Sequence, residues 1–324
     1  MKLKLNIPDH AFILPVSLFS CLFLFQVDLH AQDSSVVAGE SAAPVKVKPV
    51  KNTFQSVWII DNQTVLVPVK GTLEIDIQHR FGTVQNGYQD FWGFFAPSNI
   101  RLGVNYAPIQ KLFVGMGITK AHMLWDANAK YSFITQTKGR YPVSVTYYGN
   151  IAYDTRKDKD NSIFKYQSQR LSFFNQLIIA RKVTNKFSAQ VAVSLSHQNS
   201  VNGYYTKNDS TGQVIFEEMN HNHFAIAFSG RYKLTNVTSI MINYDQPITR
   251  HAVNNPDPNL SFGFEFNTSS HSFQFFLGNY SLLSPQQNNL YNANSPFGYT
   301  KTDGTQVKGG QFLIGFNITR LWNY

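Results

Sequence analysis

The chain has 324 residues, enough for one large β domain or two ordinary domains. Charged residues make up only 15% of it and aromatic residues another 15%, whereas soluble domains carry roughly 25% charged residues. This composition argues against a water-exposed surface and favours one that faces lipid. The formal net charge is +9, but no basic cluster is interleaved with aromatic residues, so we expect no nucleic-acid partner. Anionic lipopolysaccharide or anionic solutes suit this charge better.

The first 31 residues resemble a secretory signal peptide. Lys2 and Lys4 precede an apolar run over residues 11–25, and Ala31 offers a small residue for cleavage. A lipoprotein signal at the only cysteine, Cys21, is the alternative, but the apolar run continues past it. We therefore expect a signal peptide over residues 1–31, and a single cysteine allows no disulfide framework.

Residues 32–70 are expected to form a periplasmic linker and N-terminal segment. Residues 32–52 are rich in Ser, Ala, Pro, Val and Lys and show no usable period. Residues 54–69 contain two short apolar pieces, which fit either a periplasmic hairpin or a segment that enters the mouth of a barrel. Beyond the signal peptide no stretch of ~18 apolar residues occurs, so no transmembrane helix is expected.

Apolar and polar residues alternate from Thr72 onwards, which is typical of β-strands. In residues 72–81, for example, Leu73 and Ile75 fall on one face while Glu74 and Asp76 fall on the other. Most of these runs approach the ~9 to 11 residues of a tilted membrane strand. The twelve expected strands are residues 72–81, 99–106, 112–119, 125–135, 143–154, 171–180, 187–196, 224–232, 238–245, 260–267, 272–279 and 311–322. The run 171–180 is the weakest because both of its faces carry apolar residues.

The connections between these strands alternate between short and long, and only residues 120–124 break the pattern. Short turns on one rim and long loops on the other are typical of outer-membrane barrels. The sequence therefore predicts an all-β fold, a single antiparallel transmembrane β-barrel of about 12 strands over residues 71–324. We expect short periplasmic turns, long extracellular loops, and a place in the outer membrane of a Gram-negative cell with the N-terminus in the periplasm.

The last strand, residues 311–322, would be an exposed apolar edge unless it pairs with an earlier strand. The even strand number predicts that it closes the barrel by antiparallel pairing with residues 73–81. Its alternation ends on Trp322 and Tyr324 and resembles the C-terminal signature that the barrel-assembly machinery reads.

Five blocks of sequence carry a resemblance to a known family. They are residues 71–83, 98–118, 130–153, 194–201 and 269–279. In order and spacing they resemble the membrane-bound β-barrel domain family of unknown function, from about Phe54 to the C-terminus. The chain departs from that family at His197-Gln198-Asn199, where the family has His-Arg-Asn, and at Ser269-Ser270, where it has two glycines. The resemblance implies the fold and the membrane location, and it implies no catalytic residue.

An enzymatic alternative arises at His197 to Gly203, which is similar to the His-x-Ser-Asn-Gly setting of outer-membrane phospholipase. In a strand, residues i and i+3 point to opposite faces, so His197 and Ser200 would point apart. A nucleophile has to lie within hydrogen-bond reach of its base. We therefore expect no enzyme, and a phospholipase-like activity is kept as a minor alternative.

A second cluster, Glu217, Glu218, His221 and His223, contains groups that bind divalent ions. Its spacing matches no strong zinc pattern. We expect a solvated loop here, with no metal ligand and no cofactor in the protein.

Charged residues on the polar faces are the candidates for a lumen lining. They are Glu74, Asp76, Arg80, Arg101, Asp126, Lys130, Arg231, Asp245 and Glu265. Because four are basic and five acidic, we expect them to pair across the interior rather than form the ring of one sign that sets pore selectivity.

These faces favour a narrow channel for small solutes. The alternative is a non-conducting binding or scaffold barrel that presents its loops to partners, since Phe113, Tyr148 and Phe276 are also expected to point inward. The expected partners are the lipid bilayer, lipopolysaccharide, the barrel-assembly machinery and possible small solutes.

Overall fold

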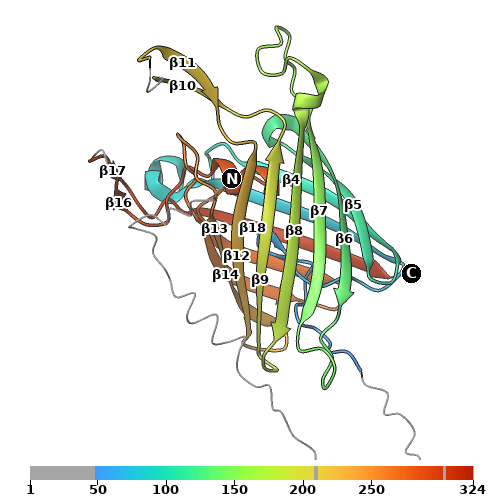
Figure 1. Cartoon of the computed structure of the whole chain (residues 1–324). Coiled ribbons are helices and arrows are strands. Elements are labelled where there is room, and N and C mark those ends of the chain that lie inside the picture. Colours follow the sequence, from blue (N-terminus) through green and yellow to red (C-terminus); the bar gives the residue numbers. More distant parts are fainter. Residues whose placement is uncertain (1–47, 208–210, 302–303, 324) are drawn as a thin grey trace, which may run out of the picture. The chain divides into compact units, whose positions relative to one another are not determined.

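The computed structural model describes residues 48–207, 211–301 and 304–323, and its main feature is a closed antiparallel β-barrel (Figure 1). The strands of the barrel are β3 (Thr72–Thr83), β4 (Asn99–Ile109), β5 (Leu112–Thr119), β6 (Leu124–Ile134), β7 (Ser144–Asp154), β8 (Leu171–Lys182), β9 (Phe187–Gln198), β12 (Asn222–Lys233), β13 (Thr238–Pro247), β14 (Asn259–Asn267), β15 (His271–Gly278) and β18 (Leu313–Asn323). In this part of the chain the twelve predicted strands are confirmed, with only their ends shifted. The predicted signal peptide, Cys21 and the linker up to residue 47 lie outside the described residues.

The barrel closes between its last strand and its first. β18 runs antiparallel to β3, with Trp322 opposite Leu73 and Ile318 opposite Ile77. This pairing confirms the prediction for the last strand. Because every strand has two neighbours, the sheet has no open edge.

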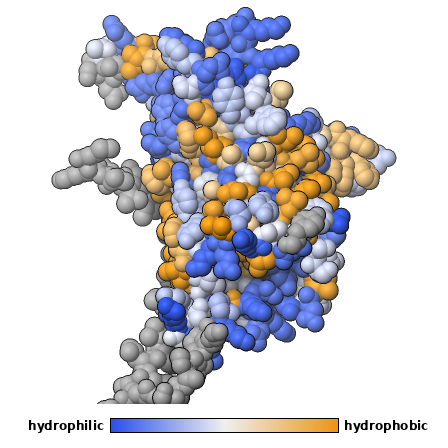
Figure 2. Space-filling view, turned by 90° about the vertical axis from the view of Figure 1, so that its right-hand side faces the viewer, coloured by the Kyte–Doolittle hydropathy of each residue, from blue (hydrophilic) through white to orange (hydrophobic). Residues whose placement is uncertain are grey.

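The wall has one apolar and one polar face, as the alternation requires. Outward side chains such as Val104, Met116, Ile242 and Phe275 are exposed. Figure 2 shows hydrophobic residues gathered across the middle of the wall and hydrophilic residues toward its two ends. An apolar outer surface of this kind suits lipid as its solvent.

The long connections lie at one end of the barrel, and together with the short β5–β6 connection they contain the smaller elements. These are η1 (Val84–Asp90), η2 (Ala121–Met123), η3 (Gln167–Arg170), the hairpin of β10 (Gly203–Lys207) and β11 (Val214–Glu218), α2 (Pro285–Tyr291), and the hairpin of β16 (Tyr299–Thr300) and β17 (Gln306–Val307). The β10–β11 hairpin extends from this end, and tight turns join the strands at the other (Figure 1). No helix in the described ranges is long and apolar enough to cross a membrane.

Residues 53–67, called here the inner segment, lie inside the barrel. They contain β1 (Trp58–Ile59) and β2 (Asn62–Gln63), a short hairpin whose turn passes through Ile60 with a positive φ of 60°. The apolar side chains of the segment pack against the inward apolar residues of the wall. This core contains Phe54, Ile59, Ile60, Val65, Tyr148, Phe174, Ile178, Met241 and Phe276. Of the two alternatives for residues 54–69, the structure therefore shows entry into the barrel.

Candidate functional site

The turn of the inner segment is bonded to two separate parts of the wall. Asp61 accepts a hydrogen bond from Arg80 of β3 at 2.7 Å. The neighbouring Asn62 donates from Nδ2 to Asn243 at 2.7 Å and to Asp245 at 2.6 Å, both on β13. One turn of backbone thus connects two parts of the wall that β14, β15 and β18 separate.

The returning arm of the hairpin is bonded through Gln63. Lys130 of β6 donates from Nζ to Oε1 of Gln63 at 2.8 Å, and Gln190 of β9 donates to the backbone oxygen of Gln63 at 2.8 Å. Lys130 is completely buried, and its ammonium also lies over the ring of Phe113. Since neutral oxygens satisfy this cation, the inner segment replaces the water that a buried amine needs.

Beside the segment, Arg101 of β4 joins two carboxylates of the wall. Its guanidinium lies 2.9 Å from Asp76 and 2.8 Å from Asp126. Asn105 donates to Glu74 at 3.2 Å and to Asp76 at 3.1 Å. Arg101 therefore lies between two carboxylates, and the candidate lumen residues form no ring of one sign.

A second ion pair links Arg231 of β12 to Glu265 of β14, with 2.5 Å between Nε and Oε2. Arg231 also donates to Gln55 of the inner segment, and Gln274 donates to Glu265 at 3.3 Å. In both clusters the ion pairs run between nearby strands along the wall. These charged residues were predicted to pair across the interior. They do not, because the inner segment occupies that space.

The nine sequence-predicted lumen residues all lie on barrel strands with their charged groups removed from solvent. The structure brings Asp76, Asp126 and Arg101 together, and Arg231 with Glu265. The other candidates find neutral partners, or, for Arg80, a carboxylate that the sequence did not single out: Asp61. In the sequence, Asp61 and Asn62 form a turn-like pair between two apolar pieces, and this was the signal that could have indicated a partner for Arg80.

The end of the lumen that faces the long loops is covered by α2. Gln286 donates to Asn150 of β7 at 2.5 Å, and its backbone oxygen accepts from Gln198 of β9 at 3.3 Å. Gln287 contacts a ring nitrogen of His122 at 2.9 Å. This stretch was predicted only as a long loop between strands, although its run of Gln and Asn residues indicated polar surroundings.

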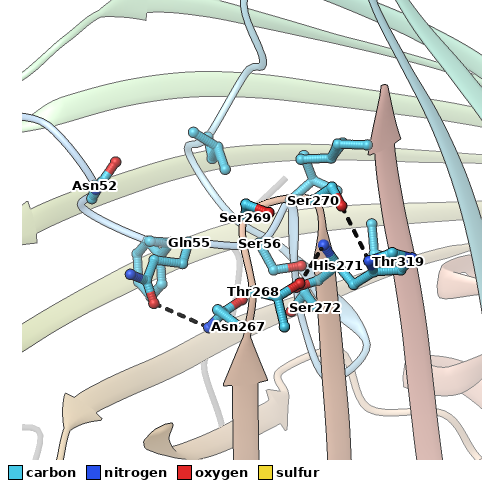
Figure 3. A pocket seen from close by; sticks show the side chains of 14 residues that line it. Asn52, Gln55, Ser56, Asn267, Thr268, Ser269, Ser270, His271, Ser272 and Thr319 are labelled. Atoms are coloured by element: carbon cyan, nitrogen blue, oxygen red, sulfur yellow. Dashed lines mark hydrogen bonds between the residues drawn. The ribbon is translucent and has the colours of Figure 1, made fainter. Parts of the chain in front are cut away.

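A cavity of about 220 Å³ lies between the inner segment and the β14–β15 turn (Figure 3). Gln55 and Asn267 are hydrogen-bonded across its edge at 3.0 Å. The described residues of its lining have hydroxyl, amide and apolar side chains and include His271, but none of them is Asp, Glu, Lys or Arg. Such a lining accommodates water or a small uncharged polar molecule.

His197 and Ser200, the candidates for enzymatic chemistry, are not arranged as a base and its nucleophile. The ring nitrogens of His197 lie 2.8 Å from Oδ1 of Asn222 and 3.0 Å from Oδ1 of Asn199. Both nitrogens therefore contact amide oxygens, and Ser200 is not their partner.

The candidate metal cluster is divided. His221 contacts Glu218 at 3.5 Å on an exposed surface. His223 instead stacks on His251, with 3.0 Å between Nδ1 and Nε2. Among the described residues, no three His, Cys, Asp or Glu side chains converge in a way that could hold a metal ion.

Fold and interior together define a membrane-bound β-barrel with a filled polar lumen. The family model described as Membrane bound beta barrel domain (DUF5777) matches residues 54–322, and the chain belongs to this family. The match begins with the inner segment, and it confirms the resemblance carried by the five sequence blocks.

The chain is also similar to solved barrels at low identity. It shares 8% identity with the NanC porin at a TM-score of 0.43, over 78% of this chain and 99% of that one. The identity is 13% with an outer membrane channel from Pseudomonas putida F1, at a TM-score of 0.41 over 79% and 97% of the two chains. With the KdgM porin it is 10%, at a TM-score of 0.40 over 78% and 99%. No curated protein matches the chain. The barrel of this protein is established by its own strand pairing.

Proposed function

We propose that the protein works in the outer membrane as a narrow channel for small solutes, and that the inner segment closes this channel at rest. The observation that carries the proposal is the set of hydrogen bonds between the inner segment and the wall. Asp61 is bonded to Arg80, Asn62 to Asp245, and Gln63 to Lys130. These wall side chains are polar, so a lumen without the segment would hold water.

The contacts of the segment allow it to leave. When it moves out, water replaces its hydrogen bonds to the wall, so a lost bond between neutral groups costs about 0.5 to 1.5 kcal/mol and a lost bond to a charged group about 1.5 to 3 kcal/mol. The packing of Ile59, Ile60 and Val65 against the wall resists departure, because water does not replace apolar contacts. The segment thus behaves as a plug that is stable at rest and removable by a force on the chain that precedes it.

The test is conductance in planar bilayers. Wild-type protein is expected to stay closed, whereas deletion of residues 53–67 is expected to give discrete conductance steps. A matched deletion of the β10–β11 hairpin, residues 203–218, removes a similar length outside the lumen and should leave the barrel closed. If the plug-deleted protein is folded and heat-modifiable but silent under varied salt and voltage, the channel proposal fails.

We also propose the topology predicted from the sequence: a signal peptide over residues 1–31, a periplasmic linker and N-terminal segment over residues 32–70, and the barrel over residues 71–324. It is supported by the position of the two described ends on the rim of short turns, where Val50 is bonded to Gln136 and Asn323 lies opposite Thr72. Lipopolysaccharide and the barrel-assembly machinery are the partners that this topology implies.

Cysteine labelling tests the orientation. Thr206→Cys on the β10–β11 hairpin should react with a membrane-impermeant maleimide in intact cells, and Lys51→Cys only after permeabilisation. The reverse pattern would contradict the topology.

A scaffold barrel is the second candidate, favoured by the β10–β11 hairpin. Its Tyr205 and Phe216 are exposed and in ring contact at 5.4 Å, and they lie opposite each other in the middle of the paired strands. A photo-crosslinker at position 216 should then recover a specific protein from intact cells. Absence of any crosslinked partner counts against this role.

A further inference from the structure

We propose that the loop between β3 and β4, residues 84–98, docks onto the lipid that surrounds the barrel at its long-loop end and anchors the protein there. This loop is called the aromatic loop below. The inference rests on the surface of the loop and holds whether or not the barrel conducts.

The aromatic loop presents an unusual number of rings to its surroundings. Tyr88 is 83% exposed and Phe95 82%, and Phe91, Trp92 and Phe94 are also exposed. Contiguous apolar surface of this kind is unfavourable in water and typically marks an interaction site. A contact that covers these rings is therefore expected.

The loop is ordered in a way that holds the rings outward. Asp90 accepts a hydrogen bond from the backbone of Gly93 at 2.9 Å, and Gly82 donates to the backbone oxygen of Gly93 at 3.0 Å. A Cβ on Gly93 would lie 2.3 Å from the Gly82 oxygen, and its φ is +85°, so this close approach requires glycine. The exposure of the rings is thus built into the backbone of the loop.

The aromatic surface of the loop continues that of the barrel wall. On the outer wall, Phe316 stacks on His79 at 5.1 Å, and His79 contacts Phe81 at 4.3 Å. Phe81 contacts Phe94 of the loop at 4.5 Å, and Phe94 contacts Phe91 at 5.8 Å. An unbroken row of rings therefore leads from the wall of the barrel onto the loop.

The row ends on rings with polar groups. Phe91 contacts Trp92 at 5.4 Å, and Trp92 contacts Tyr88 at 6.4 Å. Trp and Tyr favour the boundary between acyl chains and headgroups, where the ring is in lipid and the N–H or O–H is in water. The order from Phe on the wall to Trp and Tyr on the loop matches this boundary.

Lipid is the occupant that these observations favour. The wall with which the loop is continuous already faces lipid in a membrane-bound barrel. Asp90 is the only charged residue between positions 84 and 98, and its carboxylate accepts hydrogen bonds from Asn86 at 2.9 Å and from Gly93. The loop therefore carries one charge that opposes insertion, and hydrogen bonds within the loop partly compensate it.

The β10–β11 hairpin provides a matched comparison at the same end of the barrel. It also exposes an aromatic pair, Tyr205 and Phe216, but these rings stand among Lys207, Glu217 and Glu218. Charged neighbours favour water, so this pair is expected to stay out of the bilayer.

The experiment places a single tryptophan at each site in the full chain. Replacing Trp58, Trp125 and Trp322 by Phe leaves Trp92 as the only reporter. The control adds Trp92→Phe and Phe216→Trp to this background. After reconstitution into phosphatidylcholine vesicles with brominated acyl chains, Trp92 is expected to lose emission and resist acrylamide. Tryptophan at position 216 should keep its emission and be quenched by acrylamide.

Two results overturn the proposal. Quenching of Trp92 by acrylamide and not by bromine shows a loop in water, and protection from both quenchers shows a protein contact such as a second copy of the chain. If the tryptophan replacements impair folding, Tyr88→Cys in the otherwise wild-type protein carries an environment-sensitive fluorophore instead. Its site is unique, because the only native cysteine is Cys21 in the expected signal peptide. A water-like emission of that label also contradicts lipid docking.

Discussion

Arg80 and Asp61 form an ion pair inside the barrel, with 2.7 Å between Nη2 and Oδ1 and side chains that are 0% and 6% exposed. The pair connects the wall to the inner segment. Arg80 also donates to Asn317 of β18 at 3.0 Å and lies over the ring of Phe276. The guanidinium therefore depends on Asp61 for its only carboxylate among the described residues.

Asp61→Asn should destabilise the seat of the inner segment. Removing one partner of a buried ion pair costs about 3 to 5 kcal/mol, an upper bound here because water can reach the lumen once the segment moves. The urea midpoint of the reconstituted barrel should fall, and the open probability in bilayers should rise. Asp154→Asn is the control, since its partner Arg156 is 34% exposed and neither residue contacts the inner segment, so the open probability should not change. Equal effects of the two substitutions would contradict the role given to Asp61.

Gly117→Ala should disturb the Arg101 cluster. A Cβ at position 117 would lie 2.3 Å from Nη2 of Arg101 and 2.8 Å from Oδ2 of Asp126. Overpacking of this kind costs about 1 to 3 kcal/mol, so the temperature at which the folded band disappears in semi-native electrophoresis should fall. At Gly230 the nearest atom is 3.3 Å away, on Ile242, so Gly230→Ala should change this temperature little. An unchanged transition for Gly117→Ala would show that the cluster adapts.

The loop over residues 248–258 should loosen in acid. Burial lowers the pKa of the His251 imidazole below its ordinary value of about 6.5. An opened loop binds a proton more readily than the closed one, so closure is most stable above that value and weakens as pH falls below it. His251 contacts His223, and Arg250 is its charged neighbour in sequence, so a proton on His251 gains no anionic partner from either.

Amide hydrogen exchange checks this prediction. Protection factors for residues 248–258, corrected for intrinsic rates, should be lower at acidic than at neutral pH. His251→Gln should remove most of that dependence, because glutamine does not titrate. A pH dependence that survives the substitution would assign the effect to another group.

Truncation after Leu321 should impair membrane assembly more than it disturbs the lumen. It removes Trp322, which lies opposite Leu73 in the closing strand pair and stacks with Arg320, together with Asn323 and Tyr324, the last of which lies outside the described residues. Assembly is followed by heat-modifiable migration of the membrane fraction. Normal insertion of the truncated chain would contradict a role for these residues in assembly.

The strands and their closure could be predicted because alternation is a local property of the sequence. Even β8, whose sequence pattern predicted a strand least clearly, is present in the barrel, and the structure explains why its pattern was unclear. Phe174 and Ile178 point inward and pack with the inner segment, so apolar residues on both faces indicated a partner inside the barrel.

The filling of the lumen could not be predicted in the same way. The bond from Lys130 to Gln63 and the contact between His223 and His251 join residues distant in sequence, and no local period encodes them. The mixed signs of the lumen charges predicted ion pairs across the interior, whereas the partners in the structure depend on where the inner segment lies. Apolar packing sets the position of the inner segment, and for residues 54–69 the sequence left two alternatives open.

The turn of the inner segment also touches both strands of the seam that closes the barrel. The backbone oxygen of Ile60 accepts a hydrogen bond from Asn317 of β18 at 2.6 Å, and the next residue, Asp61, binds Arg80 of β3. Adjacent residues of one turn therefore align the first and last strands of the cylinder. A chain in which this turn is already seated has a template for joining its two ends in the correct register, so the segment that blocks the finished lumen is also suited to guide its construction.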